Sequence, residues 1–229
     1  MTIRIIGAGM AGLLAARMLR HHDPVVIEHQ EELPNNHSAV LRFRTPAIGD
    51  LLGIPFKKVR MTKASAPWRN QVADQLAYSR KTSGVIRSDR SIPLSAESHD
   101  RWVAPEDLVA RMAEGLDIRL GQSHDFSVTG EKVISTIPMP TLMSLLGYEN
   151  RFGINFKTVS GFNVRCQLHD CESYVSLYVP SPELPFNRVS ITGSELIMEY
   201  AYPGKTTREV DTIIKFKNGS GKVMGDIGE

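Results

Sequence analysis

The first 28 residues contain the feature that most restricts how this chain can fold. Residues 3–6 form a short β-branched run, as in a buried parallel strand. Residues 7–12 follow with the glycine spacing G-x-G-x-x-G, and a helix-compatible stretch then runs to Pro24. Residues 25–27 form a second apolar run that ends in Glu28. Strand, glycine turn, helix, strand and acidic residue in this order predict a βαβ unit that binds a dinucleotide.

Each glycine of the turn has its own predicted role. Gly7 allows the tight turn out of the first strand, and Gly9 leaves room for a pyrophosphate beside the backbone. Gly12 lets the helix pack closely on the sheet, and the unpaired N–H groups at the helix start favour phosphate. We therefore expect the pyrophosphate to be surrounded by Gly7, Ala8, Gly9, Met10, Ala11 and Gly12.

Glu28 is placed to read the ribose of the dinucleotide. It follows the second strand, where its carboxylate can accept hydrogen bonds from ribose hydroxyls. The same negative charge repels a 2′-phosphate, which argues against NADP. His29 comes directly after Glu28 and is included in the candidate site. The alternative interpretation is a glycine-rich turn in an ordinary α/β protein.

The composition is that of a globular protein with one large or two small domains. The chain has 229 residues, of which 41% are hydrophobic and 23% charged. No apolar run approaches the roughly 18 residues that a membrane-spanning helix needs. The first strand starts at once, so we expect no signal peptide, and Cys166 and Cys171 indicate free thiols rather than disulfides or zinc ligands. We predict a cytoplasmic location, no membrane partner and no metal site.

Positive charge is concentrated between Arg42 and Arg90. This segment has eleven Lys or Arg against three Asp, a charge of +8, whereas the whole chain carries +2. Such asymmetry predicts an anionic small-molecule substrate, with a nucleic acid or a merely solvated basic surface as alternatives. Within this segment, residues 39–45 are predicted to form a strand that places Arg42 and Arg44 on one face. That face could contact a phosphate or an electron-rich ring, or form a solvent-exposed edge.

The middle of the chain indicates a nucleotide-binding fold interrupted by an insertion. Residues 46–99 are polar and basic, with one short helix expected at 71–78. Regular structure resumes at Trp102. The expected elements are then a helix that starts at 104–107 and ends near Gly115, a strand at 118–120, a buried strand at 132–138 and a helix at 141–146. Residues 1–45 and 100–147 are thus predicted to form the nucleotide-binding domain.

The C-terminal part, residues 148–229, predicts an antiparallel β layer that covers the substrate. Strands are expected at 158–168, 174–179, 188–192 and 195–202, followed by a tail. The last two strands should form a hairpin with Gly193 and Ser194 as its loop. A pocket lining is one interpretation of the tyrosines in these strands, and core packing is the other; they are Tyr174, Tyr178, Tyr200 and Tyr202.

Together, these parts resemble the FAD-dependent flavoprotein superfamily that includes amine oxidases, protoporphyrinogen oxidases and UDP-galactopyranose mutases. The resembling stretches are GAGMAGLLAARML with Glu28, WVAPEDLVARMAEGLDIRLG and KVISTIPMPTLMSLLG. A further stretch, LYVPSPELPFNRVSI, is similar to a strand pair in the substrate domain of the mutase-like members. The resemblance covers about half of the chain.

The resemblance implies an FAD site. Gly7, Gly9 and Gly12 would surround the FAD pyrophosphate, and Glu28 would bind the adenosine ribose. Arg42 or Arg44 would replace the arginine of the Gly-Gly-Arg element that those families carry after the acidic residue. The final segment that reaches the flavin ring in those families would begin near residues 221–229, where this sequence ends.

The expected fold is α/β: a Rossmann-like FAD-binding domain with an inserted basic segment and an antiparallel substrate-covering layer. By resemblance, the expected function is that of an FAD-dependent oxidoreductase or a mutase-like enzyme acting on an anionic or nucleotide-linked small molecule. Two alternatives are a nucleic-acid-associated flavoprotein that uses residues 42–90 and an NAD-dependent dehydrogenase. No motif in the sequence assigns a catalytic residue.

Overall fold

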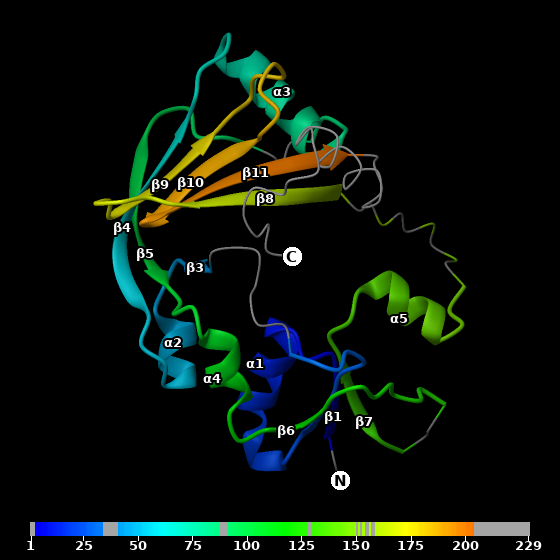
Figure 1. Cartoon of the computed structure of the whole chain (residues 1–229). Coiled ribbons are helices and arrows are strands. Elements are labelled where there is room, and N and C mark those ends of the chain that lie inside the picture. The colour runs from blue at the N-terminus through cyan, green and yellow to red at the C-terminus, as the bar shows by residue number, and fades with distance from the viewer. Residues whose placement is uncertain are drawn as a thin grey trace, which may run out of the picture. The chain divides into compact units, whose positions relative to one another are not determined.

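The chain folds into two compact units. The computed structural model describes residues 3–33, 41–87, 91–127, 130–149, 151, 153, 156 and 159–203 (Figure 1). The first unit comprises Met1–Lys57 and Trp102–Phe156, and the second comprises Lys58–Arg101 and Lys157–Glu229. Most of the basic segment thus lies in the same unit as the C-terminal strands.

A four-stranded parallel sheet forms the centre of the first unit. In the order β6-β2-β1-β7, its strands are β6 (Asp117–Arg119), β2 (Val25–Ile27), β1 (Ile3–Ile6) and β7 (Lys132–Ser135). The register pairs Ile5 with Val26 on one side and with Ile134 on the other. The β-branched residues of β1 and β2 suit the centre of a sheet that is covered on both faces.

The helices of the first unit are short. They are α1 (Met10–Met18), the 3-10 helix η1 (Arg20–His22), α2 (Ala47–Leu52), α4 (Leu108–Ala113) and α5 (Met139–Leu145). Asp23 adopts a positive φ of 47° directly before Pro24, which ends the helical stretch as the sequence predicted. The Arg17 guanidinium of α1 donates to the Met112 carbonyl at 2.8 Å, which ties α1 to the end of α4.

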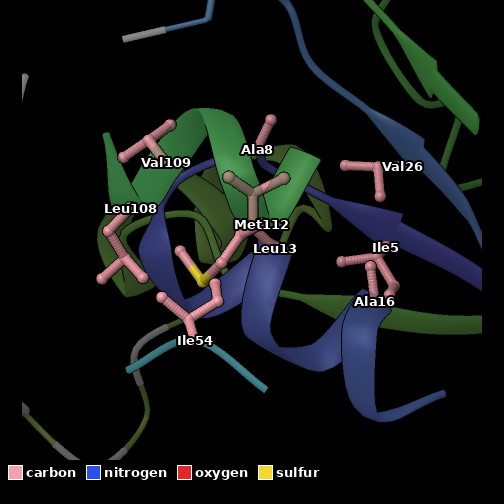
Figure 2. Packing of buried hydrophobic residues seen from close by; sticks show 9 residues of the cluster. All are labelled: Ile5, Ala8, Leu13, Ala16, Val26, Ile54, Leu108, Val109 and Met112. Atoms are coloured by element: carbon pink, nitrogen blue, oxygen red, sulfur yellow. The ribbon is translucent and has the colours of Figure 1, made fainter. Parts of the chain in front are cut away.

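The main apolar core lies between the sheet, α1 and α4 (Figure 2). Ile5 and Val26 of the sheet and Leu13 of α1 are completely buried, and Leu108 and Met112 of α4 join the same cluster. A second, smaller cluster contains Ile6, Val25 and Ile27 with Phe126 and Ile137 packed against it. The parallel sheet is therefore covered by apolar side chains on both faces, as its sequence predicted.

Three elements of the first unit differ from the sequence prediction. The strand expected at 132–138 ends at Ser135, and Val133 and Ile134 are 37% and 36% exposed, because β7 is the edge strand of its sheet. The helix expected from residue 104 starts at Leu108, since the Leu108 N–H donates to the Pro105 carbonyl at 3.1 Å and closes a turn there. Helix α5 begins at Met139, earlier than expected, because proline is tolerated in a first turn.

A seven-stranded mixed sheet contains all the strands of the second unit. Its order is β3-β5-β4-β9-β10-β11-β8 (Figure 1). The strands are β3 (Arg42–Phe43), β5 (Glu97–Val103), β4 (Lys57–Ser65), β9 (Ser173–Tyr178), β10 (Arg188–Gly193), β11 (Glu195–Pro203) and β8 (Val159–Gln167). The four strands of residues 159–203 pair with one another in antiparallel order, as expected, whereas β4 of the basic segment adds to β9 in parallel and makes the whole sheet mixed. The predicted hairpin is confirmed, with Thr192 opposite Glu195 across the turn at Gly193 and Ser194.

The basic segment is more regular than its sequence suggested. Val59 and Met61 of β4 are buried, whereas Lys58 and Arg60 are exposed, so the strand alternates although it has few apolar residues. Helix α3 (Gln71–Ser83) extends beyond the predicted residues 71–78. The Asn70 side chain caps its start by accepting a hydrogen bond from the Ala73 N–H at 3.0 Å. At its end Gly84 takes a left-handed conformation with a φ of 75°.

The buried core of the first unit makes a direct stability prediction. Replacing Leu13 by alanine should lower the free energy of unfolding by about 3 kcal/mol, because the cavity cannot close fully among the packed sheet and helices. Leu145→Ala is the matched control, since Leu145 is 57% exposed and should change stability by less than about 0.5 kcal/mol. Urea denaturation of the two variants checks this; equal losses would show that Leu13 does not lie in a rigid core.

Candidate dinucleotide-binding site

The turn between β1 and α1 needs glycine at its first position. Gly7 has a φ of 99°, and its N–H donates to the Ile27 carbonyl at 2.9 Å. A Cβ atom at this position would lie 2.8 Å from the Thr136 hydroxyl oxygen. Both the backbone conformation and the neighbouring side chain therefore exclude a larger residue here.

The other two glycines differ in what surrounds them. A Cβ atom at Gly12 would lie 1.8 Å from the Gly7 carbonyl oxygen, so only glycine allows α1 to approach the turn this closely. A Cβ atom at Gly9 would meet nothing within 4 Å, and Gly9 is exposed. Gly12 is thus required by the fold itself, whereas the space beside Gly9 is open to a ligand.

The N-terminus of α1 has the features of an anion-binding site. Gly9, the N-cap residue, has no side chain that could cap the helix, and no acidic residue lies in the first turn. The Leu13 N–H donates to the Gly9 carbonyl at 3.0 Å, which makes it the first N–H of the helical ladder. The N–H groups of Met10, Ala11 and Gly12 precede that ladder at the positive end of the helix dipole. This geometry suits a pyrophosphate.

Glu28 links the end of β2 to the glycine turn. Its side chain is buried, and Oε2 accepts a hydrogen bond from the Ala8 N–H at 2.8 Å. The other oxygen, Oε1, accepts from the Gln30 N–H at 3.0 Å and lies 2.8 Å from Nδ1 of His29. The His29 side chain is 73% exposed. The structure thus places Ala8, Glu28 and His29 side by side, as the candidate site requires.

These contacts keep Glu28 ionised. Burial by itself raises the pKa of the Glu28 carboxyl group, but the N–H donors of Ala8 and Gln30 and the neighbouring His29 outweigh it. The net result is a pKa below the usual value of 4.5. A full negative charge therefore adjoins the turn at neutral pH, where it can accept ribose hydroxyls and repel a 2′-phosphate.

Sequence reasoning missed Thr136 as a member of this site. Its hydroxyl, directly after β7, donates to the Ile6 carbonyl at 2.9 Å and lies 3.2 Å from the Gly7 carbonyl oxygen. The residue holds the glycine turn from the neighbouring strand. The available signal was its position at the carboxyl end of a predicted parallel strand, where ligand-binding residues of α/β sheets gather.

The segment after β6 also supports this site. The Gly121 N–H donates to the Gln30 carbonyl at 2.8 Å, and the Gln122 N–H donates to the Glu28 carbonyl at 2.9 Å. These backbone hydrogen bonds hold the chain that follows β2 and therefore fix Glu28 from outside the glycine turn. Backbone partners of this kind leave no signal in the residue types.

The expected arginine face is not formed. Strand β3 contains only Arg42 and Phe43, which pair with Val103 and Trp102, and Arg44 lies in an exposed bend after it. The alternation of a longer strand, on which the prediction rested, is therefore absent at Arg44, and the rest of the expected strand, residues 39–40, lies outside the described residues. A ligand contact by Arg42 or Arg44 stays a prediction.

The four tyrosines, for which pocket lining and core packing were the two interpretations, lie on opposite faces of the mixed sheet. Arg188 pairs with both Tyr178 and Glu199, so Tyr178 shares their face, while Tyr200 next to Glu199 points to the other. Tyr178 packs edge-on against Tyr78 of α3, with ring centroids 5.6 Å apart. By the same alternation, Tyr174 lies on the α3 face and Tyr202 on the face of Tyr200.

The face opposite α3 carries an aromatic patch made of Phe162, Tyr200 and Tyr202. The Phe162 and Tyr200 rings stack with centroids 4.4 Å apart and an interplanar angle of 7°, and Tyr202 stacks on Phe162 at 6.0 Å. All three side chains are partly buried. A flat, partly open aromatic surface of this kind can bind a planar or apolar group.

No group of three or more His, Cys, Asp or Glu side chains among the described residues is placed to hold a metal ion. None of the helices described above has the length and apolarity needed to cross a membrane.

The similarity to known proteins is structural. No protein-family model matches the chain, and no curated protein matches its sequence. An oxidoreductase from Methanosarcina mazei matches with a TM-score of 0.62 and 10% identity over 95% of this chain and 83% of its own. The PF1083 protein from Pyrococcus furiosus gives a TM-score of 0.58 and 11% identity over 95% and 84%.

A tetrameric 2-methyl-3-hydroxypyridine-5-carboxylic acid oxygenase also matches in fold, with a TM-score of 0.51 and 14% identity. The match covers 95% of this chain but 64% of the oxygenase, so the chain spans less than two thirds of that protein. At these identities the likeness concerns the fold. The chain therefore shares an α/β fold, both units included, with proteins described as an oxidoreductase and an oxygenase.

The hydrogen bonds of Glu28 predict a pH dependence of stability. Because the folded-state pKa is lowered, the carboxylate stabilises the fold above its unfolded pKa, and this contribution is lost as the pH falls through the folded value. Glu28→Gln should be less stable than wild type near neutral pH, and the difference should shrink below about pH 4.5. Urea denaturation across this range checks the prediction. Glu149→Gln is the control, since Glu149 is 80% exposed. Parallel stability curves against pH for wild type and Glu28→Gln would contradict the prediction.

Proposed function

We propose that the chain is an FAD-binding oxidoreductase. The observation that carries the proposal is the open N-terminus of α1 at Gly9 next to the ionised carboxylate of Glu28. Together they present N–H donors for a pyrophosphate and an acceptor for a ribose, which are the two groups that identify the adenosine half of a dinucleotide. The similarity to an oxidoreductase and an oxygenase in fold supports a redox function.

The topology supports a Rossmann-like unit. The order β6-β2-β1-β7 corresponds to strands 3-2-1-4 of the doubly wound dinucleotide-binding fold, with the glycine turn after its first strand. Strand β6, which takes the place of strand 3 in that fold, begins only at Asp117, after the whole of the basic segment. This long interruption favours FAD over NAD, because simple nicotinamide-binding folds connect these strands by a short crossover.

The residues of the first unit fit the adenosine half of FAD. The N–H groups of Met10, Ala11 and Gly12 would hold the pyrophosphate, and Glu28 would accept the ribose hydroxyls while keeping its bond to Ala8. A bound flavin supplies the redox chemistry itself, so the protein has to bind it, orient it and exclude competing reactions. Among the families that the sequence resembles, the amine oxidases fit this proposal better than the mutases.

The aromatic patch of Phe162, Tyr200 and Tyr202 is the surface we assign to the substrate. Its stacked rings favour a substrate with a planar or apolar portion. The excess of Lys and Arg in residues 42–90 predicts that this substrate also carries an anionic group.

The basic segment gives less support to nucleic-acid binding than its charge suggests. Lys58 and Arg60 both pair with Asp100, at 2.9 and 3.3 Å, and the Arg69 guanidinium lies 4.3 Å from the Trp68 ring centroid. Several cations of this segment thus have partners within the chain. RNA or DNA binding that weakens with increasing salt would support the nucleic-acid alternative.

The Gly9→Asp substitution tests cofactor binding without disturbing the fold. Aspartate is a good N-cap residue and suits the positive end of the helix dipole, so stability should be unchanged or slightly higher. Its carboxylate would occupy the phosphate position, and FAD affinity should fall by roughly a hundredfold or more. Fluorescence titration with FAD measures the affinity, and urea denaturation measures the stability.

Met18→Ala is the control for the same helix, because Met18 is 54% exposed at its far end and should leave FAD affinity unchanged. The proposal fails if the wild-type protein takes up no FAD, or if Gly9→Asp binds FAD as tightly as wild type does.

A further inference from the structure

Lys81 of α3 uses its ammonium group to hold a distant loop. Its Nζ atom donates hydrogen bonds to the carbonyl oxygens of Val179, Ser181 and Phe186, at 3.0, 2.7 and 2.7 Å. An ammonium group has three N–H donors, so this set of acceptors satisfies it completely. The side chain is half-buried, and the three acceptors all come from the connection between β9 and β10, residues 179–187.

The composition of this connection explains why it needs an external donor. Its sequence is VPSPELPFN, in which three of nine residues are proline and provide a carbonyl but no N–H. The Val179 N–H already donates to the Asn187 carbonyl at 2.9 Å, and the Asn187 N–H donates to the Glu199 carbonyl at 2.8 Å. The loop therefore has a surplus of acceptors, and Val179 and Ser181 are themselves buried. Buried carbonyls without a donor destabilise a fold.

The loop also positions aromatic side chains. Phe186 packs edge-on against Tyr200, with ring centroids 6.1 Å apart and an interplanar angle of 78°. A change in the conformation of residues 179–187 would therefore alter the packing against the aromatic patch of Phe162, Tyr200 and Tyr202. Burial lowers the pKa of Lys81 to about 8, so the charged ammonium form still predominates at neutral pH.

We propose that the carbonyls of Val179, Ser181 and Phe186 form a site for a primary ammonium ion, which the chain fills with the side chain of Lys81. The site organises the β9–β10 connection in the way a bound monovalent cation would. Removing the lysine side chain leaves the three acceptors in place and opens the site to a free alkylammonium ion. The inference is independent of the proposed cofactor, because it involves residues of the second unit alone.

Chemical rescue of Lys81→Ala tests this proposal. The substitution removes Cγ, Cδ, Cε and Nζ, and propylammonium has the same three carbons and one nitrogen. We expect Lys81→Ala to have a lower melting temperature than wild type, and propylammonium chloride at millimolar concentration to raise it by roughly 3 °C. Wild-type protein should show no such increase, since its own lysine fills the site.

Two compounds and one variant serve as controls. Tetramethylammonium has the charge without N–H donors, and 1-propanol has the same size without the charge, so neither should stabilise Lys81→Ala. Arg80→Ala changes the exposed neighbouring residue of the same helix and should not respond to propylammonium. Equal effects of propylammonium on wild type and Lys81→Ala, or equal effects of the three compounds on Lys81→Ala, would overturn the proposal.

Lys81→Met keeps the test decisive if the alanine variant does not fold. Methionine fills most of the space but donates no hydrogen bond. Amide hydrogen exchange in peptides that cover residues 179–187 should become roughly tenfold faster or more in this variant, with exchange in the parallel sheet unchanged. Exchange equal to wild type in these peptides would show that the ammonium does not hold the loop.

Discussion

The close approach of α1 to the turn after β1 is the constraint on which the candidate site depends. A Cβ atom at Gly12 would lie 1.8 Å from the Gly7 carbonyl oxygen, and a backbone oxygen cannot move aside as a flexible side chain can. The contact brings the start of α1 to the carboxyl edge of the sheet, beside Gly9. The Thr136 hydroxyl holds the same turn from β7. The geometry that we assign to the pyrophosphate is thus built by packing within the first unit.

Glu28 shows how the same residue serves the fold and the site. Its hydrogen bond from the Ala8 N–H ties the end of β2 to the glycine turn, and the bond from Gln30 keeps the second carboxylate oxygen in place. These donors outweigh the effect of burial and keep the group charged. Each carboxylate oxygen has two lone pairs, so a ribose hydroxyl can be accepted without breaking either bond. The site therefore needs little rearrangement to receive an adenosine ribose.

The sequence predicted the parts of the structure that depend on neighbours in the chain. The order of β1, the glycine turn, α1, β2 and Glu28 is local, and so is the hairpin at Gly193 and Ser194. Thr136 was missed because its partners, Ile6 and Gly7, are 130 and 129 residues away. The sequence left open whether Tyr178 and Tyr200 share a surface, because the answer needs the register between strands, which composition does not contain. Strand β4 was missed since Val59 and Met61 alone carry its apolar alternation.

The net charge of residues 42–90 overstates how many cationic side chains are available to bind a ligand. The excess of Lys and Arg between residues 42 and 90 suggested a surface for an anion, but a side chain counts toward such a surface only if no group of the protein already uses it. Lys81 is satisfied by three carbonyls, and Lys58 and Arg60 share Asp100. At the start of α1, in contrast, no cationic side chain is needed, because backbone N–H groups and the helix dipole supply the positive potential. In the proposed cofactor site, recognition of the phosphates would therefore rest on the backbone at Gly9, which no count of charged residues reveals.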